Sequence, residues 1–237
     1  MNGPRLAAAL VHVYTASGVL FAFAATMEVC SATPDPRVVF LLLAAAVLVD
    51  ATDGPLARRA KVKQRLPSID GRTIDDIVDY LTFTFVPLLL VWRMGWLPEP
   101  AVVWIAPALL ASLFGFANTA AKDEAGGFFL GFPSYWNVVA FYAGFAHRLY
   151  GPWVNAAMLL VLALLTVLPA RFLYPNLAPR PWRTPIIVGA LFWLGMMLWL
   201  LVDYPQAPAW IVWLSLLYPA FYFGLSYRLA GSRGDLG

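Results

Sequence analysis

Residues 50–80 read DATDGPLARRAKVKQRLPSIDGRTIDDIVDY and interrupt an otherwise apolar chain with a dense cluster of charge. The stretch holds six aspartates and six basic residues, namely Asp50, Asp53, Asp70, Asp75, Asp76 and Asp79 with Arg58, Arg59, Lys61, Lys63, Arg65 and Arg72. Charges at a membrane surface are well solvated, whereas carboxylates inside an apolar span are costly and mark functional sites. Which of these aspartates lie inside the membrane therefore indicates which of them form a functional site.

The composition places the chain in a membrane. Of the 237 residues, 61% are hydrophobic and 12% are charged, whereas a soluble domain has about 45–50% apolar and ~25% charged residues. The net charge of +3 is explained by an excess of Lys and Arg on the cytoplasmic side and needs no nucleic-acid partner. The single cysteine, Cys30, excludes an intrachain disulfide and a cysteine-based metal cage.

Eight apolar runs are long enough to cross a bilayer as helices. They cover residues 6–28, 37–57, 73–95, 101–120, 134–150, 153–173, 186–203 and 208–228, and are separated by Pro- and Gly-rich breaks. The first run is longer than the apolar region of a signal peptide, so we expect it to be retained. The sequence predicts an all-α polytopic membrane protein with about eight transmembrane helices in a single domain, residues 1–237.

The basic residues predict the orientation. With the 58–72 loop in the cytoplasm, only Arg37, Arg93 and Arg148 of the 16 Lys and Arg residues fall on the opposite side. Both termini are then cytoplasmic, in agreement with an even number of helices.

Four aspartates are predicted to converge at the cytoplasmic edge of the membrane. Asp50 and Asp53 share a face near the end of the 37–57 helix, and Asp75 and Asp79 share a face near the start of the next helix. One loop joins the two helix ends. Such carboxylates repel one another, and a pair of divalent cations, Mg²⁺ or Mn²⁺, would relieve the repulsion. Asp76 falls off this face and is expected to pair with Arg72 or to face solvent.

Phosphate chemistry is indicated by the residues that follow Asp53. Gly54 and Ala57 leave the backbone accessible to a ligand or a helix. Arg58 offers a fork of donors that suits a phosphate.

The pattern Asp50-x2-Asp53-Gly54-x2-Ala57-Arg58, followed by Gly71-x3-Asp75-x3-Asp79, resembles the signature of the CDP-alcohol phosphotransferases. The resemblance implies an integral membrane enzyme, commonly a homodimer, that uses two divalent metals and displaces CMP from a CDP-linked substrate with an alcohol. The loop between Arg58 and Gly71 is longer and more basic than the family commonly has.

Two stretches, ARRAKVKQRLPSIDGRTIDDIVDYLTFTFVP at 57–87 and GFPSYWNVVAFY at 131–142, are similar to the bacterial members that join CDP-diacylglycerol to choline. This resemblance implies phospholipid biosynthesis in the bacterial inner membrane, with the active site facing the cytoplasm. Another acceptor alcohol (serine, inositol phosphate or glycerol phosphate) stays open, and a cation transporter is a distant alternative.

The resemblance also implies roles for individual residues. Metal ligands are Asp50, Asp53, Asp75 and Asp79, and Asp79 is also the catalytic base. CDP-diacylglycerol would be bound by Gly54, Ala57, Arg58, Gly71, His12 and Thr15. The other basic residues of the loop form a surface for anionic headgroups, or one or two of them hold the diphosphate of the substrate. The alternative is that the aspartates cap helices or pair with the Lys and Arg of the loop.

Choline is a quaternary ammonium ion that aromatic faces and carboxylates can hold. The candidates are Tyr135, Trp136, Asn137, Tyr142, Tyr80 and Glu124. An aromatic belt at the membrane interface is the alternative explanation for these tyrosines and tryptophans.

Overall fold

The computed structural model describes residues 3–118, 122–123, 127–173 and 178–234. The chain divides into two compact units. The first unit comprises the residues up to Met94 together with Trp136–Phe141, and the second comprises Gly95–Tyr135 together with the residues from Tyr142 onward.

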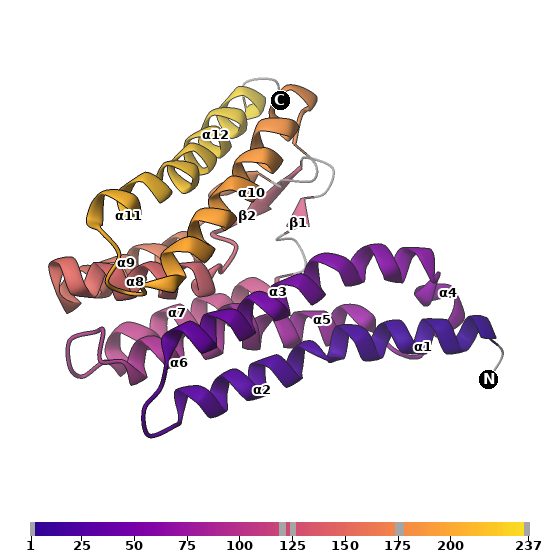
Figure 1. The fold of residues 1–237 in the computed structure, drawn as a ribbon. Coiled ribbons are helices and arrows are strands. Elements are labelled where there is room, and N and C mark those ends of the chain that lie inside the picture. Colours follow the sequence, from indigo (N-terminus) through magenta and orange to yellow (C-terminus); the bar gives the residue numbers. More distant parts are fainter. Residues whose placement is uncertain (1–2, 119–121, 124–126, 174–177, 235–237) are drawn as a thin grey trace. The chain divides into compact units, whose positions relative to one another are not determined.

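The first unit is built from helices that pack side by side (Figure 1). They are α1 (Gly3–Ala16), α2 (Gly18–Val29), α3 (Pro36–Arg59), α4 (Val62–Arg65), α5 (Gly71–Asp79), the π-helix η1 (Tyr80–Phe85), α6 (Val86–Arg93) and the start of α8 (Trp136–Tyr150). The predicted 6–28 helix is interrupted at Ser17, whose hydroxyl donates to the Tyr14 carbonyl. Small buried residues such as Ala22, Ala25 and Ala46 let α2 and α3 approach each other closely.

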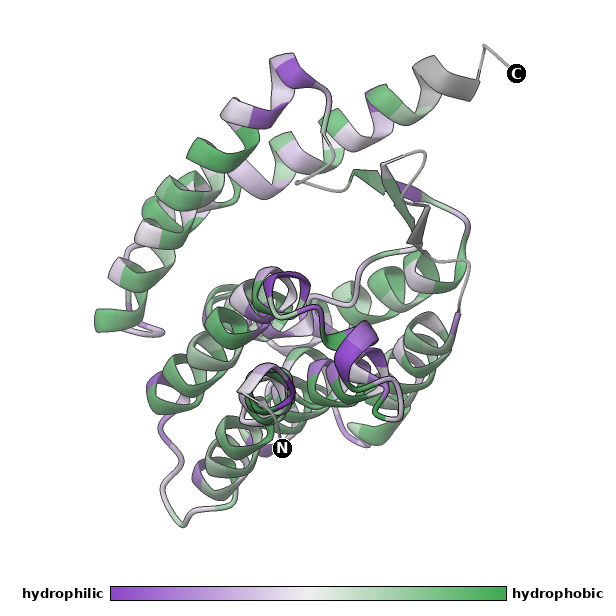
Figure 2. Cartoon of the chain, turned by 90° about the vertical axis from the view of Figure 1, so that its right-hand side faces the viewer, coloured by the Kyte–Doolittle hydropathy of each residue, from purple (hydrophilic) through white to green (hydrophobic). Residues whose placement is uncertain are grey.

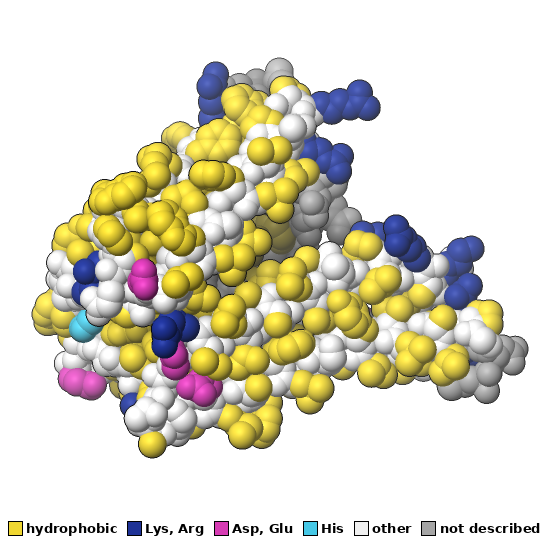
Figure 3. All heavy atoms as spheres, viewed as in Figure 1, with side chains coloured by type: hydrophobic (Ala, Val, Ile, Leu, Met, Phe, Trp, Pro, Cys, Tyr) yellow, Lys and Arg dark blue, Asp and Glu magenta, His cyan; other side chains and the backbone are white. Residues whose placement is uncertain are grey.

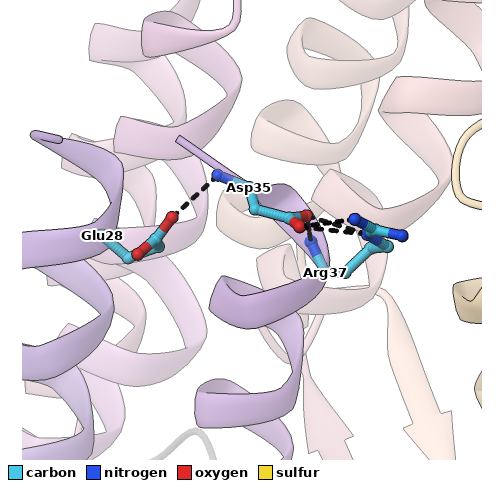
Figure 4. Close-up of polar contacts among 3 residues, drawn as sticks. All are labelled: Glu28, Asp35 and Arg37. Carbon is cyan, nitrogen blue, oxygen red and sulfur yellow. Dashed lines mark hydrogen bonds and ion pairs between the residues drawn. The ribbon is translucent and has the colours of Figure 1, made fainter. Parts of the chain in front are cut away.

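Polar contacts fix the start of α3 (Figure 4). The Glu28 carboxylate accepts a hydrogen bond from the Asp35 backbone N–H at 2.8 Å. Asp35 caps α3 by accepting from the Arg37 N–H at 2.9 Å, and it forms an ion pair with the Arg37 guanidinium at 2.7 Å. This guanidinium holds the pKa of Asp35 below its usual range. Because the first residue of α3 is fixed, the directions in which Asp50 and Asp53 point near its other end are fixed as well.

A π-helical turn follows Asp79 where a continuous helix was expected over 73–95. Pro87 explains this difference, because proline has no N–H to donate and its ring clashes with the carbonyl four residues earlier in a regular helix. The Val86 N–H instead reaches the Leu81 carbonyl, five residues back. π-Helical turns are often found at functional sites, and this one begins directly after an aspartate of the predicted site.

The second unit combines helices with a small sheet. Its elements are α7 (Val102–Ala117), β1 (Lys122–Asp123), β2 (Phe128–Leu130), the rest of α8, α9 (Pro152–Val167), β3 (Arg171–Leu173), α10 (Arg180–Val202), α11 (Ala209–Ser215) and α12 (Leu217–Gly234). The three strands are antiparallel in the order β1-β2-β3, with Phe129 opposite Phe172. The Tyr222 hydroxyl of α12 donates to the Leu173 carbonyl at 2.6 Å and anchors the sheet.

Two local predictions were wrong. Residues 171–173 were expected to end the helix over 153–173, but they form β3, because the backbone of β2 and the side-chain hydroxyls of Tyr222 and Ser226 in α12 satisfy their hydrogen bonds. The Pro-rich segment before residue 186 was expected to be a loop, yet α10 begins at Arg180. Pro181 lies in the first turn of α10, where an N–H has no partner within the helix and proline is tolerated.

The fold is that of a helical, multi-pass membrane protein. Among the described residues, four helices are long and apolar enough to cross a membrane, namely Gly3–Val29, Pro36–Arg59, Arg180–Val202 and Ala209–Ala230. Val102–Ala117 and Pro152–Val167 are shorter apolar helices. The helices are hydrophobic along most of their length (Figure 2). The count of eight spans and the cytoplasmic termini stay predictions.

Candidate functional site

Three of the four predicted carboxylates converge in the first unit. Asp50 comes from the last third of α3, and Asp75 and Asp79 come from one face of α5. Each offers one carboxylate oxygen, and these oxygens all lie within 4.8 Å of one another. All three side chains are half-buried. The helical spacing and the single connection between α3 and α5 therefore produce the acidic cluster that the sequence predicts.

The acidic cluster, Asp50, Asp75 and Asp79, fits a hard divalent cation. Mg²⁺ takes oxygen ligands at about 2.0–2.1 Å, so two ligands on opposite sides of one ion lie about 4 Å apart. The separation of the carboxylate oxygens is compatible with that geometry. Half-buried carboxylates this close repel one another strongly, and a bound cation removes the repulsion.

Asp53 lies outside the acidic cluster and lines a neighbouring cavity. Its side chain is 7% exposed. The cavity has a volume of about 650 Å³ and is formed by α1, α3, α4, α5 and the loop before α5. All six residues predicted to bind CDP-diacylglycerol line it: His12, Thr15, Gly54, Ala57, Arg58 and Gly71. Asp75 also lines this cavity, so it belongs to both the cavity and the acidic cluster.

Sequence reasoning missed part of the cavity wall. The missed residues include Gln64, Pro67 and Ile69, all from the segment between α3 and α5, whereas Lys61 and Lys63 are among the basic loop residues for which diphosphate binding was left open. This segment was recognised as longer and more basic than is common in the family, and its length was the signal that could have assigned it to the wall.

Gly71 allows a close approach of His12, whereas Gly54 lies in ordinary contact with Arg58. A Cβ atom on Gly71 would lie 2.9 Å from His12 Cε1, so the absence of a side chain lets the imidazole pack on the start of α5. A Cβ on Gly54 would lie 3.4 Å from Arg58 Nη1, which is an ordinary van der Waals distance. His12 is 7% exposed, and its Nε2 has no hydrogen-bond partner among the described residues.

The remaining aspartates of the stretch have structural partners. Asp70 caps α5, since its carboxylate accepts from the Thr73 hydroxyl at 2.9 Å and from the Arg72 N–H at 3.1 Å. These bonds, the Thr73 hydroxyl first, hold the pKa of Asp70 below its usual range. Asp76 pairs with Arg72 at 3.5 Å, which confirms the prediction made for it.

The predicted choline residues are distributed over both units. Tyr80, Trp136 and Asn137 belong to the first unit, whereas Tyr135 and Tyr142 belong to the second. Glu124 lies outside the described residues. Tyr80 follows Asp79 directly and is half-buried, and the Trp136 side chain is fully buried.

Tyr135 and Tyr142 have partners within the second unit. The Tyr142 hydroxyl is hydrogen-bonded to the Ser215 hydroxyl at 2.9 Å and accepts from Trp193 Nε1 at 3.0 Å. The ring of Tyr135 packs edge-on against Phe132. The choline-binding roles of these residues stay predictions.

The fold and the acidic cluster define a multi-pass membrane protein whose carboxylates can bind a divalent cation. No family model matches the chain. The chain is 42% identical over 168 residues to the phosphatidylcholine synthase of Pseudomonas aeruginosa, covering 70% of this chain and 68% of that protein. It is 34% identical over 229 residues to the phosphatidylcholine synthase of Legionella pneumophila, covering 93% and 88%. It is also 33% identical over 207 residues to the phosphatidylcholine synthase of Rhizobium meliloti, covering 85% and 82%.

The chain belongs to the phosphatidylcholine synthase family, and the resemblance to CDP-alcohol phosphotransferases is confirmed. It is therefore a membrane-bound transferase of phospholipid biosynthesis.

Proposed function

We propose that the chain transfers the phosphatidyl group of CDP-diacylglycerol to choline and releases CMP. The observation that carries this proposal is the position of Asp75, which joins the acidic cluster to a cavity lined by every residue predicted to bind the CDP-linked substrate. The names of the relatives support choline as the acceptor.

In this proposal the cavity holds the CDP end of the substrate. His12 and Thr15 contact the nucleotide from α1, and Gly54 and Ala57 let it approach the backbone of α3. Arg58 donates to the phosphate groups. Asp50, Asp53, Asp75 and Asp79 are the proposed ligands of two divalent ions, Mn²⁺ or Mg²⁺. When bound, such ions neutralise the phosphate charge and make the phosphorus more electrophilic.

Asp79 is the proposed general base. It accepts the hydroxyl proton of choline as the choline oxygen forms a bond to the phosphorus of the phosphatidyl group. The bond from this phosphorus to the oxygen of the CMP phosphate breaks, and CMP leaves with the electron pair. Tyr80 adjoins Asp79 in the same unit and is the aromatic residue that we propose for the choline cation.

The distribution of Lys and Arg residues supports a membrane topology for the chain. We propose eight transmembrane helices, with both termini and the active site on the cytoplasmic side of the bacterial inner membrane. We also propose a homodimer, as the family resemblance implies.

A panel of acceptor alcohols tests the function. Purified protein in detergent micelles is given CDP-diacylglycerol and Mn²⁺ with choline, serine, inositol, inositol phosphate or glycerol phosphate, and the release of CMP is measured. We expect turnover with choline to exceed that with every other acceptor by at least about 100-fold, because only choline presents a cation without N–H donors. Turnover with another acceptor and none with choline would overturn the proposed acceptor.

Replacement of Gly71 tests the position of His12. Gly71→Ala places a Cβ 2.9 Å from His12 Cε1 and 3.2 Å from Nδ1, so the imidazole must move. We expect KM for CDP-diacylglycerol to rise about tenfold, equivalent to ~1.4 kcal/mol of binding free energy, with little change in kcat. Gly195→Ala is the matched control, because a Cβ there meets nothing within 4 Å. Equal KM values in the two variants would contradict this role for His12.

A further inference from the structure

The segment between α3 and α5 has a defined conformation. After α3 ends at Arg59, Lys61 takes a left-handed backbone conformation (φ 48°, ψ 46°) that a residue with a side chain rarely adopts. The next residue, Val62, is buried at 7% exposure, and α4 contacts both α1 and α3. Arg65 donates to the Pro4 carbonyl at 3.4 Å. The segment is thus anchored at Val62 and packed against the helices that carry the site.

The basic residues in and beside this segment differ in whether they line the cavity. Lys61 and Lys63 line the cavity together with Arg58 and Arg72, whereas Arg59 and Arg65 do not. Lys and Arg side chains gather over the surface where α3 ends and α4 lies (Figure 3). The strained backbone at Lys61 begins the turn that places α4 beside the cavity.

The cationic groups at the cavity differ in their partners. The Arg72 guanidinium pairs with Asp76. Among the residues that the structure describes, the side chains of Arg58, Lys61 and Lys63 make no hydrogen bond or ion pair. Uncompensated positive charges that share one concave surface attract an anion and strengthen its binding.

The position of Asp75 indicates that the anion bound in the cavity is a diphosphate. Asp75 lines the same cavity and also belongs to the acidic cluster. A diphosphate in the cavity would meet cationic side chains from α3 and the following segment, and at Asp75 it would border the acidic cluster that could hold metal ions. Each phosphate of a diphosphate diester is ionised at neutral pH, so these cations balance its charge.

We propose that Lys61 and Lys63 bind the diphosphate of the CDP-linked substrate, so that the additional segment determines affinity for this substrate. The proposal rests on the proposed function and adds two residues that the family signature does not contain. The proposal assigns the lysine ammonium groups to binding, because both phosphates of the diphosphate already carry a negative charge before transfer.

The experiment compares Lys61→Gly and Lys63→Ala with Arg59→Ala. Glycine adopts the left-handed conformation at no steric cost, so Lys61→Gly removes the ammonium and keeps the turn. Arg59→Ala removes one positive charge at the end of α3, next to the segment but outside the cavity wall. We expect KM for CDP-diacylglycerol to rise about tenfold in each lysine variant, with kcat and KM for choline within about twofold of the unmodified chain. Lys63→Arg is expected to retain most of the affinity.

Inhibition by soluble nucleotides separates substrate binding from attraction of the segment to anionic lipid. CDP and cytidine are used as inhibitors in micelles with and without phosphatidylglycerol. The inhibition constant of CDP should rise about tenfold in both lysine variants in both kinds of micelle, while that of cytidine stays constant. An unchanged inhibition constant for CDP, or a KM effect that vanishes without phosphatidylglycerol, would overturn the proposal. Lack of activity in the unmodified chain would instead reject the proposed function.

Discussion

Replacement of Asp79 with asparagine is expected to lower turnover by at least about 1000-fold. Positioned general bases contribute about 10²–10⁴ in rate, and Asp79 also lies in the acidic cluster, where its carboxylate oxygen is within 4.8 Å of those of Asp50 and Asp75. The amide keeps the size of the side chain but cannot take the proton of choline. The release of CMP in single-turnover experiments measures the loss, and displacement of the substrate by CDP measures the binding that remains.

Two controls distinguish the base from a residue that only holds metal. Asp76→Asn removes a neighbouring carboxylate that pairs with Arg72 outside the acidic cluster, so its turnover should stay within about threefold of the unmodified chain. Excess Mn²⁺ should leave Asp79→Asn inactive. Turnover of Asp79→Asn near the unmodified rate, or its recovery in excess Mn²⁺, would remove Asp79 from the role of base.

Removal of divalent cations is expected to abolish turnover completely. The half-buried carboxylates of Asp50, Asp75 and Asp79 repel one another without a cation, and the diphosphate then loses the ions that neutralise it. Treatment with EDTA should stop the release of CMP, and added Mn²⁺ or Mg²⁺ should restore it.

Measuring the Mn²⁺ affinity of Asp50→Asn tests whether the metal binds at the acidic cluster. Loss of a second-shell partner of a metal ligand typically lowers metal affinity about 10–100-fold, so loss of the Asp50 carboxylate itself should have at least this effect. Titration calorimetry with Mn²⁺ measures the affinity of Asp50→Asn independently of activity, and Asp35→Asn serves as the control, because Asp35 caps the opposite end of α3. Full turnover in EDTA, or equal Mn²⁺ affinities in these two variants, would reject the metal site.

Helical periodicity was sufficient to predict that Asp50, Asp75 and Asp79 lie together, but it also placed Asp53 with them, which the structure does not. Asp75 and Asp79 are four residues apart on one helix, and a single segment joins that helix to the end of α3, so few arrangements keep Asp50 away from them. The separate position of Asp53 could not be predicted. Residues three apart differ by about 60° around a helix, and the packing of α1 against both α3 and α5 decides which of the two carboxylates meets Asp75 and Asp79.

The conformation of the segment between α3 and α5 could not be predicted from the sequence. Its charge predicted either a surface for anionic headgroups or one or two residues that hold the diphosphate, without saying which. The burial of Val62 and the left-handed backbone of Lys61 place Lys61 and Lys63 along the cavity. Both features depend on contacts with α1 and α3 and leave no periodic signal in the sequence.

The small sheet of the second unit was missed for a different reason. β2 and β3 have three residues each and are separated by two helices. Strands this short show no alternation that could be recognised, and the bonds from Tyr222 and Ser226 that support β3 come from residues far along the chain.

The position of Asp75 predicts that binding of the cation and binding of the nucleotide are coupled. If Asp75 holds a cation and the cavity binds the nucleotide, as proposed, the two binding equilibria are interdependent, because Asp75 belongs to both sites. Linkage requires this effect to be reciprocal: the factor by which the cation tightens the nucleotide equals the factor by which the nucleotide tightens the cation. With such coupling, the cation is bound most tightly while the CDP-linked substrate occupies the cavity, and release of CMP weakens the binding of the cation.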